Sequence, residues 1–370
     1  MRDGASQIFY PAVSIAIVAL VLLVTEDGPA IMGSGLGIVA GMLALAGLVS
    51  IWRPRWQLLM SGVTAHAAAI VLIGALPEVS GKAGLGFWAL VVATWLTAWA
   101  FTQGLSGLAL PHRAARALQG IAVPLVFGLW ILILWEIVVR GFAIPVVLLP
   151  APSVVWQKLI ASVPTLAADF RQTFKAVLFG YVFGGIAGFV VAILADRVPF
   201  LRRGLLPIGN LASALPIIGI APVMVMWFGF DWQSKAAVVV VMTFFPMLIN
   251  TIAGLTAAEA IARDLMRTYG AGYWQTLLKL RLPAALPFVF NALKINSTLA
   301  LIGAIVAEFF GTPVVGMGFR ISTEVGRMGI DMVWAEIAMA ALAGSLFYGL
   351  ISLVERAATF WHPSYRTERM

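Results

Sequence analysis

Few residues of this chain could perform chemistry. The sequence contains no cysteine, which excludes disulfides, thiol nucleophiles and thiolate metal sites. The three histidines share no spacing typical of a metal site: His66, His112 and His362. The one Gly-Lys pair, at residues 81–82, is followed by alanine, so the phosphate-binding pattern G-x-x-x-x-G-K-[ST] is absent. We therefore expect no catalytic residue, no metal site and no cofactor in this chain.

Charged residues inside long apolar runs are the remaining candidates for function, because a charge within a bilayer is costly. Lys294 and Glu308 lie about four helical turns apart in the run 287–310, so they share one face of a helix. Asn291 and Thr298 lie on the same face. This polar stripe is a candidate for the lining of a translocation path or gate. The alternative is that Lys294 extends to the inner interface and Glu308 caps the outer end. We favour the alternative for Lys294 and the path or gate for Glu308.

Other polar or small residues in the apolar runs have structural interpretations. Glu136 and Arg140 are spaced as an i,i+4 ion pair near the end of a helix. His66 is interpreted as a hydrogen-bonded packing residue rather than a proton relay. Three glycines follow the small-xxx-small spacing that lets helix backbones approach closely: Gly180, Gly184 and Gly188.

The composition places these residues in a membrane. Of the 370 residues, 61% are hydrophobic and only 11% are charged, with a mean hydropathy of +0.99. A soluble domain carries about 25% charged residues, so the chain is expected to be an integral membrane protein in a lipid bilayer. The net charge of +8 is dispersed between apolar runs, as membrane topology requires. We therefore expect no nucleic-acid partner.

The sequence predicts an all-α polytopic protein with about ten transmembrane helices. Each needs about 20 apolar residues, and the candidates are 8–24, 31–51, 57–76, 87–109, 118–139, 174–195, 205–228, 236–256, 287–310 and 333–354. Three prolines make the seventh the least regular span. Lys and Arg are more abundant at the two termini and in the links that follow the even-numbered spans than in the links that follow the odd-numbered spans, which predicts that both termini are cytoplasmic. A charged break at 111–120 suggests two modules, residues 1–111 with four spans and residues 112–370 with six.

A polar loop at about 257–285 lies between the eighth and ninth spans, on the predicted cytoplasmic side. Its first half, TAAEAIARDLMRTYG, is rich in helix formers and ends at Gly270, which suits a left-handed C-terminal residue. Its second half, GYWQTLLKLRL, predicts a short amphipathic helix stopped by Pro283. One face of that helix carries Trp274, Leu277, Leu278 and Arg281. The loop could lie in the lipid interface or dock a soluble partner.

The spacing of this loop resembles the signature loop of ABC importer permeases. In that family, Glu-Ala-Ala is followed by three residues, Gly, nine residues and Ile-x-Leu-Pro. Here Gly270, Leu280 and Leu282-Pro283 keep the register, whereas Asp264, Leu265 and Met266 replace Glu-Ala-Ala. Five further ordered segments resemble the nitrate/sulfonate/taurine-type branch: 135–156, 214–230, 244–255, 282–295 and 307–321. The first 110 residues lie outside the resemblance.

The resemblance implies a fold and a set of partners. It implies a type I ABC importer permease core of six helices, here preceded by four extra helices of unknown role, in a bacterial inner membrane. Cytoplasmic ABC ATPase subunits on separate chains hydrolyse ATP, an extracytoplasmic solute-binding protein delivers the substrate, and a second permease subunit, identical or a sibling chain, completes the path. The implied ATPase-coupling residues are Asp264, Arg267, Gly270, Trp274, Leu278, Leu282 and Pro283.

The substrate implied by the branch is a small solute, either nitrate-, sulfonate- or taurine-like or a pyrimidine or vitamin precursor. The chain itself is then a transport subunit and not an enzyme. An ion-gradient-driven secondary transporter is the alternative, because Lys294 and Glu308 lie within a predicted span.

Overall fold

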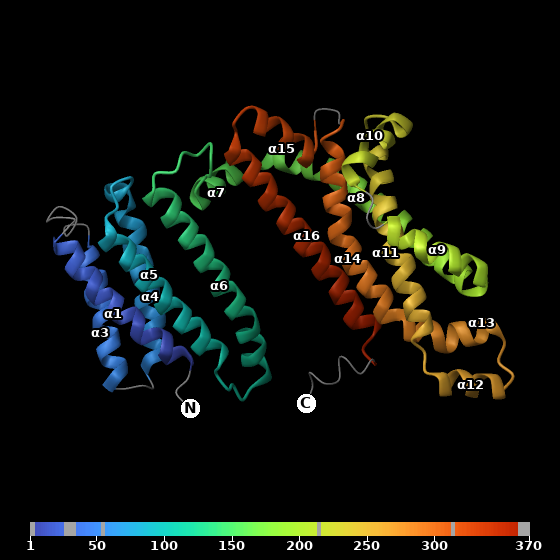
Figure 1. The fold of residues 1–370 in the computed structure, drawn as a ribbon, viewed down its shortest axis with the longest axis horizontal. Helices are drawn as coiled ribbons and strands as arrows, with labels where there is room; N and C mark the ends of the chain where they lie inside the picture. The colour runs from blue at the N-terminus through green and yellow to red at the C-terminus, as the bar shows by residue number, and fades with distance from the viewer. Residues whose placement is uncertain (1–3, 26–34, 53–55, 213–215, 312–314, 362–370) are drawn as a thin grey trace. The chain divides into compact units, whose positions relative to one another are not determined.

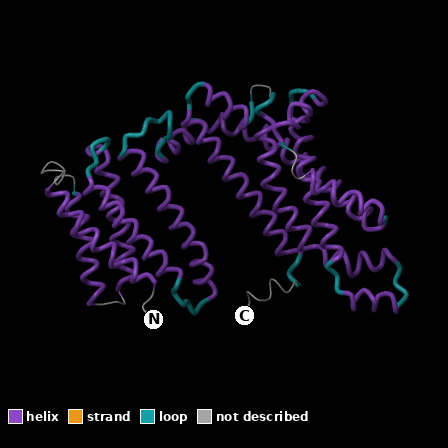
Figure 2. Tube along the Cα trace, in the orientation of Figure 1, coloured by secondary structure: helices purple, strands orange, loops and turns teal. Residues whose placement is uncertain are grey.

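The structure is a computed structural model that describes residues 4–25, 35–52, 56–212, 216–311 and 315–361. Throughout these ranges the regular elements are helices, and Figure 2 shows no strand among them. Among the described residues, seven helices are long and apolar enough to cross a membrane: Gln57–Val79, Leu85–Ser106, Arg113–Gly141, Val163–Arg197, Trp232–Thr256, Tyr273–Glu308 and Ile330–Ala358. Shorter apolar helices cover Tyr10–Ala19, Leu36–Ala46 and Ile217–Phe228. The expectation of an all-α polytopic protein is confirmed.

The chain divides into two compact units, Met1–Gln157 and Lys158–Met370. Unit 1 holds α1 (Gly4–Thr25), α3 (Leu36–Trp52), α4 (Gln57–Val79), α5 (Leu85–Ser106) and α6 (Arg113–Gly141), and α7 (Pro152–Ala161) spans the division. Helix α6 packs against α4 and α5, so packing assigns it to unit 1. The module boundary expected at residues 111 and 112 was inferred from sequence rather than from packing, and it stays a prediction.

The core of unit 1 is formed by apolar residues of α1, α3, α4, α5 and α6, among them Leu43, Leu72 and Leu90. The expected ion pair on α6 is present: Arg140 Nε lies 2.6 Å from Glu136 Oε1. Both residues also bind Ser153, whose hydroxyl donates to Glu136 and accepts from Arg140. This network fixes the chain as it leaves α6.

Unit 2 is a bundle of long helices. It contains α8 (Val163–Arg197), α9 (Pro199–Ala212), α10 (Ile217–Phe228), α11 (Trp232–Thr256), α12 (Ala260–Thr268), α13 (Tyr273–Thr276), a π-helical turn η2 (Leu277–Arg281), α14 (Leu282–Glu308), α15 (Met317–Gly326) and α16 (Ile330–Ala358). Helix α11 packs extensively on both α8 and α14. In Figure 1, α12 and α13 lie at one end of this unit and α15 and α10 at the other.

The glycines of α8 explain its close packing on α11. A Cβ added at Gly184 would lie 2.8 Å from the Val240 carbonyl oxygen, and one added at Gly180 would lie 2.7 Å from the Ala236 carbonyl oxygen. A Cβ at Gly188 would also overlap the backbone of α11. Since only glycine fits at these positions, the expected helix–helix packing through small residues is confirmed.

Two expected elements differ from the structure. The seventh span, predicted at 205–228, is divided between α9 and α10, with residues 213–215 outside the described part. Pro216 is the N-cap of α10 and has an extended backbone, with a ψ of 115°, so α10 starts there as a separate helix. Helix α8 is also longer than the span predicted at 174–195, because it begins at Val163 with Pro164 in its first turn, where a proline is tolerated.

Candidate functional site

The loop between α11 and α14 forms two short helices that meet at Gly270. Helix α12 ends there with two backbone hydrogen bonds, from Ala271 to the Met266 carbonyl and from Gly270 to the Arg267 carbonyl, both 2.9 Å. This is the Schellman pattern, in which the residue after the helix takes a left-handed conformation. Gly270 has a φ of +69°, as the sequence predicted. The bend therefore depends on a glycine at this position.

The second half of the loop differs from the prediction. Pro283 does not stop a helix there but lies in the first turn of α14. The π-helical turn η2 immediately precedes it and ends with a hydrogen bond from the Leu282 N–H to the Leu277 carbonyl. A proline would clash with the carbonyl of an ordinary helical turn, and the wider π turn removes that conflict. Residues 273–308 consequently form one long helical segment.

One face of this segment is attached to the bundle. The Arg281 guanidinium makes two hydrogen bonds to the Asp196 carboxylate, of 2.6 and 2.8 Å, and its Nε donates to the Leu255 carbonyl at 3.0 Å. The Tyr273 hydroxyl donates to the same carboxylate at 3.0 Å. Leu277, on the same face, is fully buried with Leu255. These contacts join the second half of the loop to the ends of α8 and α11.

Large apolar side chains are exposed elsewhere on the loop. Trp274 and Leu278, one turn apart, are 64% and 59% exposed. On α12 and at its C-cap, large side chains recur every fourth residue and are also exposed: Ile261, Leu265 and the C-cap Tyr269. No residue of α12 is buried. An apolar face on an amphipathic helix outside the bundle is typical of a docking surface for a protein groove or a membrane interface.

The remaining predicted loop residues have modest local contacts. Asp264 and Arg267 form an exposed pair with a separation of 3.5 Å, and such a surface pair contributes little to stability. Leu282 and Pro283 are half-buried at the start of α14. All seven predicted loop residues lie on one continuous segment of unit 2.

The four candidate path residues on α14 fall into different environments. Asn291 and Thr298 are exposed in the single chain. Lys294 forms an ion pair of 2.7 Å with Glu355 of α16, whose side chain is 7% exposed. Glu308, the last residue of α14, is buried. The structure thus separates Glu308 from the exposed stripe, and a path or gate role for the four residues stays a prediction.

Glu308 belongs to a buried polar cluster at the end of the unit where α15 lies. Its carboxylate accepts hydrogen bonds from the Thr173 hydroxyl at 2.8 Å and from the Gly318 N–H at 2.7 Å. Asp169 accepts from the Gly316 N–H at 2.7 Å and from Arg320 Nε at 2.8 Å. The hydrogen bond from Arg320 to Asp169 raises the pKa of that guanidinium. Two carboxyl groups therefore hold the beginning of α15 by accepting N–H groups of its first turn, which have no partner within the helix.

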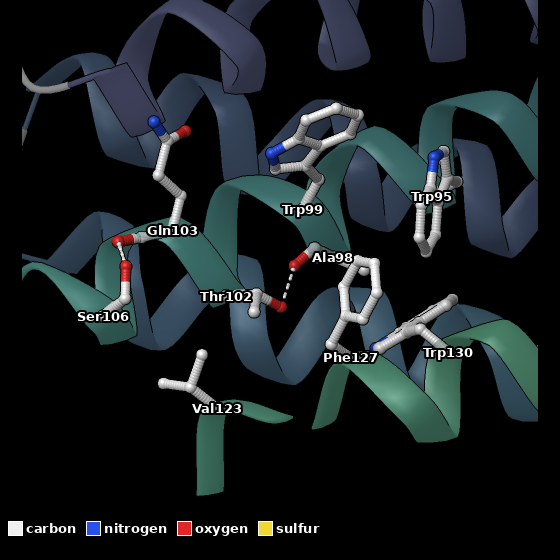
Figure 3. Close-up of a pocket in the computed structure, with 9 residues that line it drawn as sticks. All are labelled: Trp95, Ala98, Trp99, Thr102, Gln103, Ser106, Val123, Phe127 and Trp130. Atoms are coloured by element: carbon white, nitrogen blue, oxygen red, sulfur yellow. Dashed lines mark hydrogen bonds between the residues drawn. The ribbon is translucent and has the colours of Figure 1, made fainter. Parts of the chain in front are cut away.

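Unit 1 contains a separate cavity of about 250 Å³ between α5 and α6. Figure 3 shows Trp95, Trp99 and Gln103 on the α5 wall and Phe127 and Trp130 on the α6 wall. None of its lining residues is ionisable. The cavity is thus not a candidate for proton or ion chemistry.

Comparison with known proteins identifies the kind of protein to which this geometry belongs. The family of binding-protein-dependent transport system inner membrane components matches residues 180–360. A formylaminopyrimidine transport permease of Halalkalibacterium halodurans is 31% identical over 253 residues, which are 67% of this chain and 98% of that protein. The chain belongs to the ABC transporter permease family. It is therefore a transport subunit of a multi-pass inner-membrane type, as the sequence predicted.

Two further relatives show the range of the permease family around this chain. A probable ABC transporter permease of Haemophilus influenzae is 30% identical over 227 residues, covering 61% of this chain and 92% of its own length. A putative aliphatic sulfonates transport permease of Bacillus subtilis is 27% identical over 251 residues, covering 67% and 89% respectively. Permeases of this family work with ATPase and binding-protein partners. The similarity to the sulfonate-type branch is confirmed.

Sequence reasoning missed two carboxylates of this permease. Asp196 directly follows the span predicted at 174–195, where an interfacial charge is ordinary, and Asp169 lies in the link before that span. Their partners, Arg281 and Arg320, are 85 and 151 residues away in the sequence. The sequence carried no signal of either pairing, because a charge near the end of an apolar run is common and no spacing rule connects residues so far apart.

Proposed function

We propose that this permease is driven by a separate cytoplasmic ATPase, which docks on the loop at 257–285. The observation that carries the proposal is the exposed apolar surface of α12 and α13, on helices whose bend is set by Gly270. Buried apolar anchors contribute most of the affinity at protein interfaces. Asp264, Arg267, Leu282 and Pro283 would position these helices rather than supply the contact area.

The remaining features of the proposal concern assembly and topology. The loop and the end of α16 lie at the same end of unit 2 (Figure 1), which supports a cytoplasmic C-terminus. We assign the N-terminus to the same side from the distribution of Lys and Arg. A second permease subunit, identical or a sibling chain, would complete the path, with Asn291 and Thr298 facing it and Lys294 and Glu308 as candidate gate groups. The module at 1–111 is proposed to be a membrane extension of unassigned role.

The proposed cargo is a small solute delivered by an extracytoplasmic binding protein. Relatives are named for aliphatic sulfonates and for formylaminopyrimidine, which supports either a sulfonate-like anion or a pyrimidine vitamin precursor. Radiolabelled taurine and formylaminopyrimidine are suitable probes in proteoliposomes that contain the purified complex and ATP.

Docking is tested by co-purification of the tagged permease from membranes. We expect an ATPase subunit to accompany the wild-type chain and to be lost from the Trp274→Ser/Leu278→Ser variant. Val325→Ser is the matched control, because Val325 is a similarly exposed apolar residue on α15, at the other end of unit 2. Retention of the ATPase by the double variant would contradict the docking assignment.

A second measurement distinguishes the proposed ATP-driven permease from the alternative, an ion-gradient-driven transporter. Uptake of the labelled probes is measured in proteoliposomes with and without the ATPase subunits. Uptake that persists without ATPase subunits and follows a proton or sodium gradient would contradict the proposed function.

A further inference from the structure

We propose that α8 transmits motion between the two ends of unit 2, from the loop helix α13 to the outer helix α15. In this proposal Asp196 is the inner joint and Asp169 the outer joint. The inference rests on the proposed coupling role of the loop and adds the route by which its displacement reaches the other end of the subunit.

The inner joint is a buried ion pair between Asp196 and Arg281 with a fixed hydrogen-bond geometry. The Asp196 side chain is 3% exposed and Arg281 is 15% exposed. Two parallel hydrogen bonds from a guanidinium to a carboxylate fix both distance and orientation. Tyr273 adds a third hydrogen bond to the same carboxylate, and Arg197 lies 4.6 Å over the Tyr273 ring. A displacement of α13 must therefore either carry the end of α8 with it or break several charge-assisted contacts.

The outer joint repeats this chemistry at the other end of the same helix. The Asp169 side chain is completely buried and binds Arg320 of α15 at 2.8 Å. Asp169 also accepts the Gly316 N–H, and Thr173, one turn further along α8, accepts the Met317 N–H at 2.9 Å. Two successive turns of α8 thus hold the backbone at the start of α15. Movement of α8 along or about its axis would be passed to α15.

Between the two joints, α8 is one continuous helix, and we expect it to move as a rigid body. Asp169 and Asp196 are 27 residues apart on one uninterrupted helix, a distance of about 40 Å at 1.5 Å per residue. The proline of α8 lies in its first turn, so the described helix has no proline kink between the joints. The glycine contacts with α11 bring the two backbones together, so α8 and α11 are expected to move together.

A contribution to folding stability does not by itself explain why α8 carries these two aspartates. A buried ion pair gains little stability over apolar residues of similar size, although removal of one partner is strongly destabilising. An apolar contact would satisfy packing without fixing direction. The occurrence of directed arginine–aspartate contacts at both ends of a single helix is what a transmitting element needs.

The test uses the cysteine-free sequence. A single reporter, Ser322→Cys, is introduced on the exposed side of α15, and its reaction rate with a membrane-impermeant maleimide is measured in the purified complex with its co-purified ATPase. Rates are compared without nucleotide and with ATP plus vanadate. In the wild-type background we expect a nucleotide-dependent change of rate. Absence of such a change would overturn the proposal.

The inner joint is then removed with Asp196→Ala/Arg281→Ala, which eliminates both charges and leaves none uncompensated in the interior. We expect the ATPase to remain bound and to hydrolyse ATP, because Trp274 and Leu278 are intact, while the nucleotide-dependent change at residue 322 is lost. The matched control is Lys158→Ala/Asp331→Ala, an ion pair of 3.0 Å between α7 and α16 that lies outside the route. The control should keep the change.

The outcomes distinguish the two proposals. If the wild-type chain binds no ATPase, the proposed function fails before the route is considered. If the ATPase binds and the joint variant keeps the full nucleotide-dependent change, the transmission route through α8 is wrong. Should the alanine pair not yield a monodisperse complex, the isosteric Asp196→Asn variant is measured instead, and an unaltered change in it counts against the proposal.

Discussion

The close packing of α8 on α11 leads to a quantitative prediction for two neighbouring glycines. Gly184 faces α11, and a Cβ at that position would overlap the Thr243 hydroxyl and lie 2.8 Å from the Val240 carbonyl oxygen. Gly185, the next residue, is also buried, but its Cβ would make only an ordinary contact of 3.7 Å with the methyl group of Met247, at the end of a flexible side chain. The same substitution, glycine to alanine, should therefore have opposite effects at the two positions.

The magnitude follows from what must move. The obstructing Val240 atoms belong to the backbone, so α11 would have to shift by about 0.6 Å to reach an ordinary contact of 3.4 Å from 2.8 Å. Overpacking of this kind costs about 1–3 kcal/mol, whereas alanine gains about 1 kcal/mol over glycine inside a helix. We expect Gly184→Ala to lose up to about 2 kcal/mol and Gly185→Ala to gain up to about 1 kcal/mol.

Thermal unfolding in detergent, followed by the loss of the monodisperse peak, measures the difference. For a unit of this size 1 kcal/mol corresponds to about 2–4 °C in Tm, so the two variants should differ by between about 2 and 12 °C. The order of Tm values should be Gly185→Ala, wild type, then Gly184→Ala. A Gly184→Ala variant as stable as Gly185→Ala would show that the two backbones are not in contact, and the packing argument would be wrong.

Further predictions concern the loop and the buried charges. Gly270→Ala should cost about 1 kcal/mol locally, because alanine resists the left-handed conformation, and should weaken ATPase co-purification. Gly272→Ala, equally open but with a φ of −70°, should not weaken it. Lys294→Ala should lower Tm more than Lys294→Met/Glu355→Gln, because the single variant leaves a buried carboxylate without its cation; equal Tm values would refute this. Glu308→Gln should also lower Tm, since an amide replaces one of two accepting oxygens with a donor, and an unchanged Tm would count against the hydrogen-bond assignment.

The sequence by itself determined the class of this protein and the local form of its loop. Apolar runs long enough to cross a bilayer are visible in the sequence itself, so the polytopic all-α fold could be predicted without the structure. Gly270 could be placed because a helix end needs a left-handed residue, and its φ of +69° agrees. The small-xxx-small spacing on α8 likewise indicated close packing before the partner helix was known. Local geometry depends on neighbouring residues, which a sequence displays.

Tertiary structure decided which charges meet. Asp196 reaches Arg281 and Asp169 reaches Arg320 across 85 and 151 residues, and no spacing rule connects such positions. The structure also showed that Pro283 follows a π turn instead of ending a helix. Glu308, which shares a helical face with Lys294 in the sequence, lies instead in a buried polar cluster with Thr173 and Gly318. The physical reason is common to all three. A helical face is fixed by the sequence, but the groups that oppose it are fixed only when other helices pack against that face.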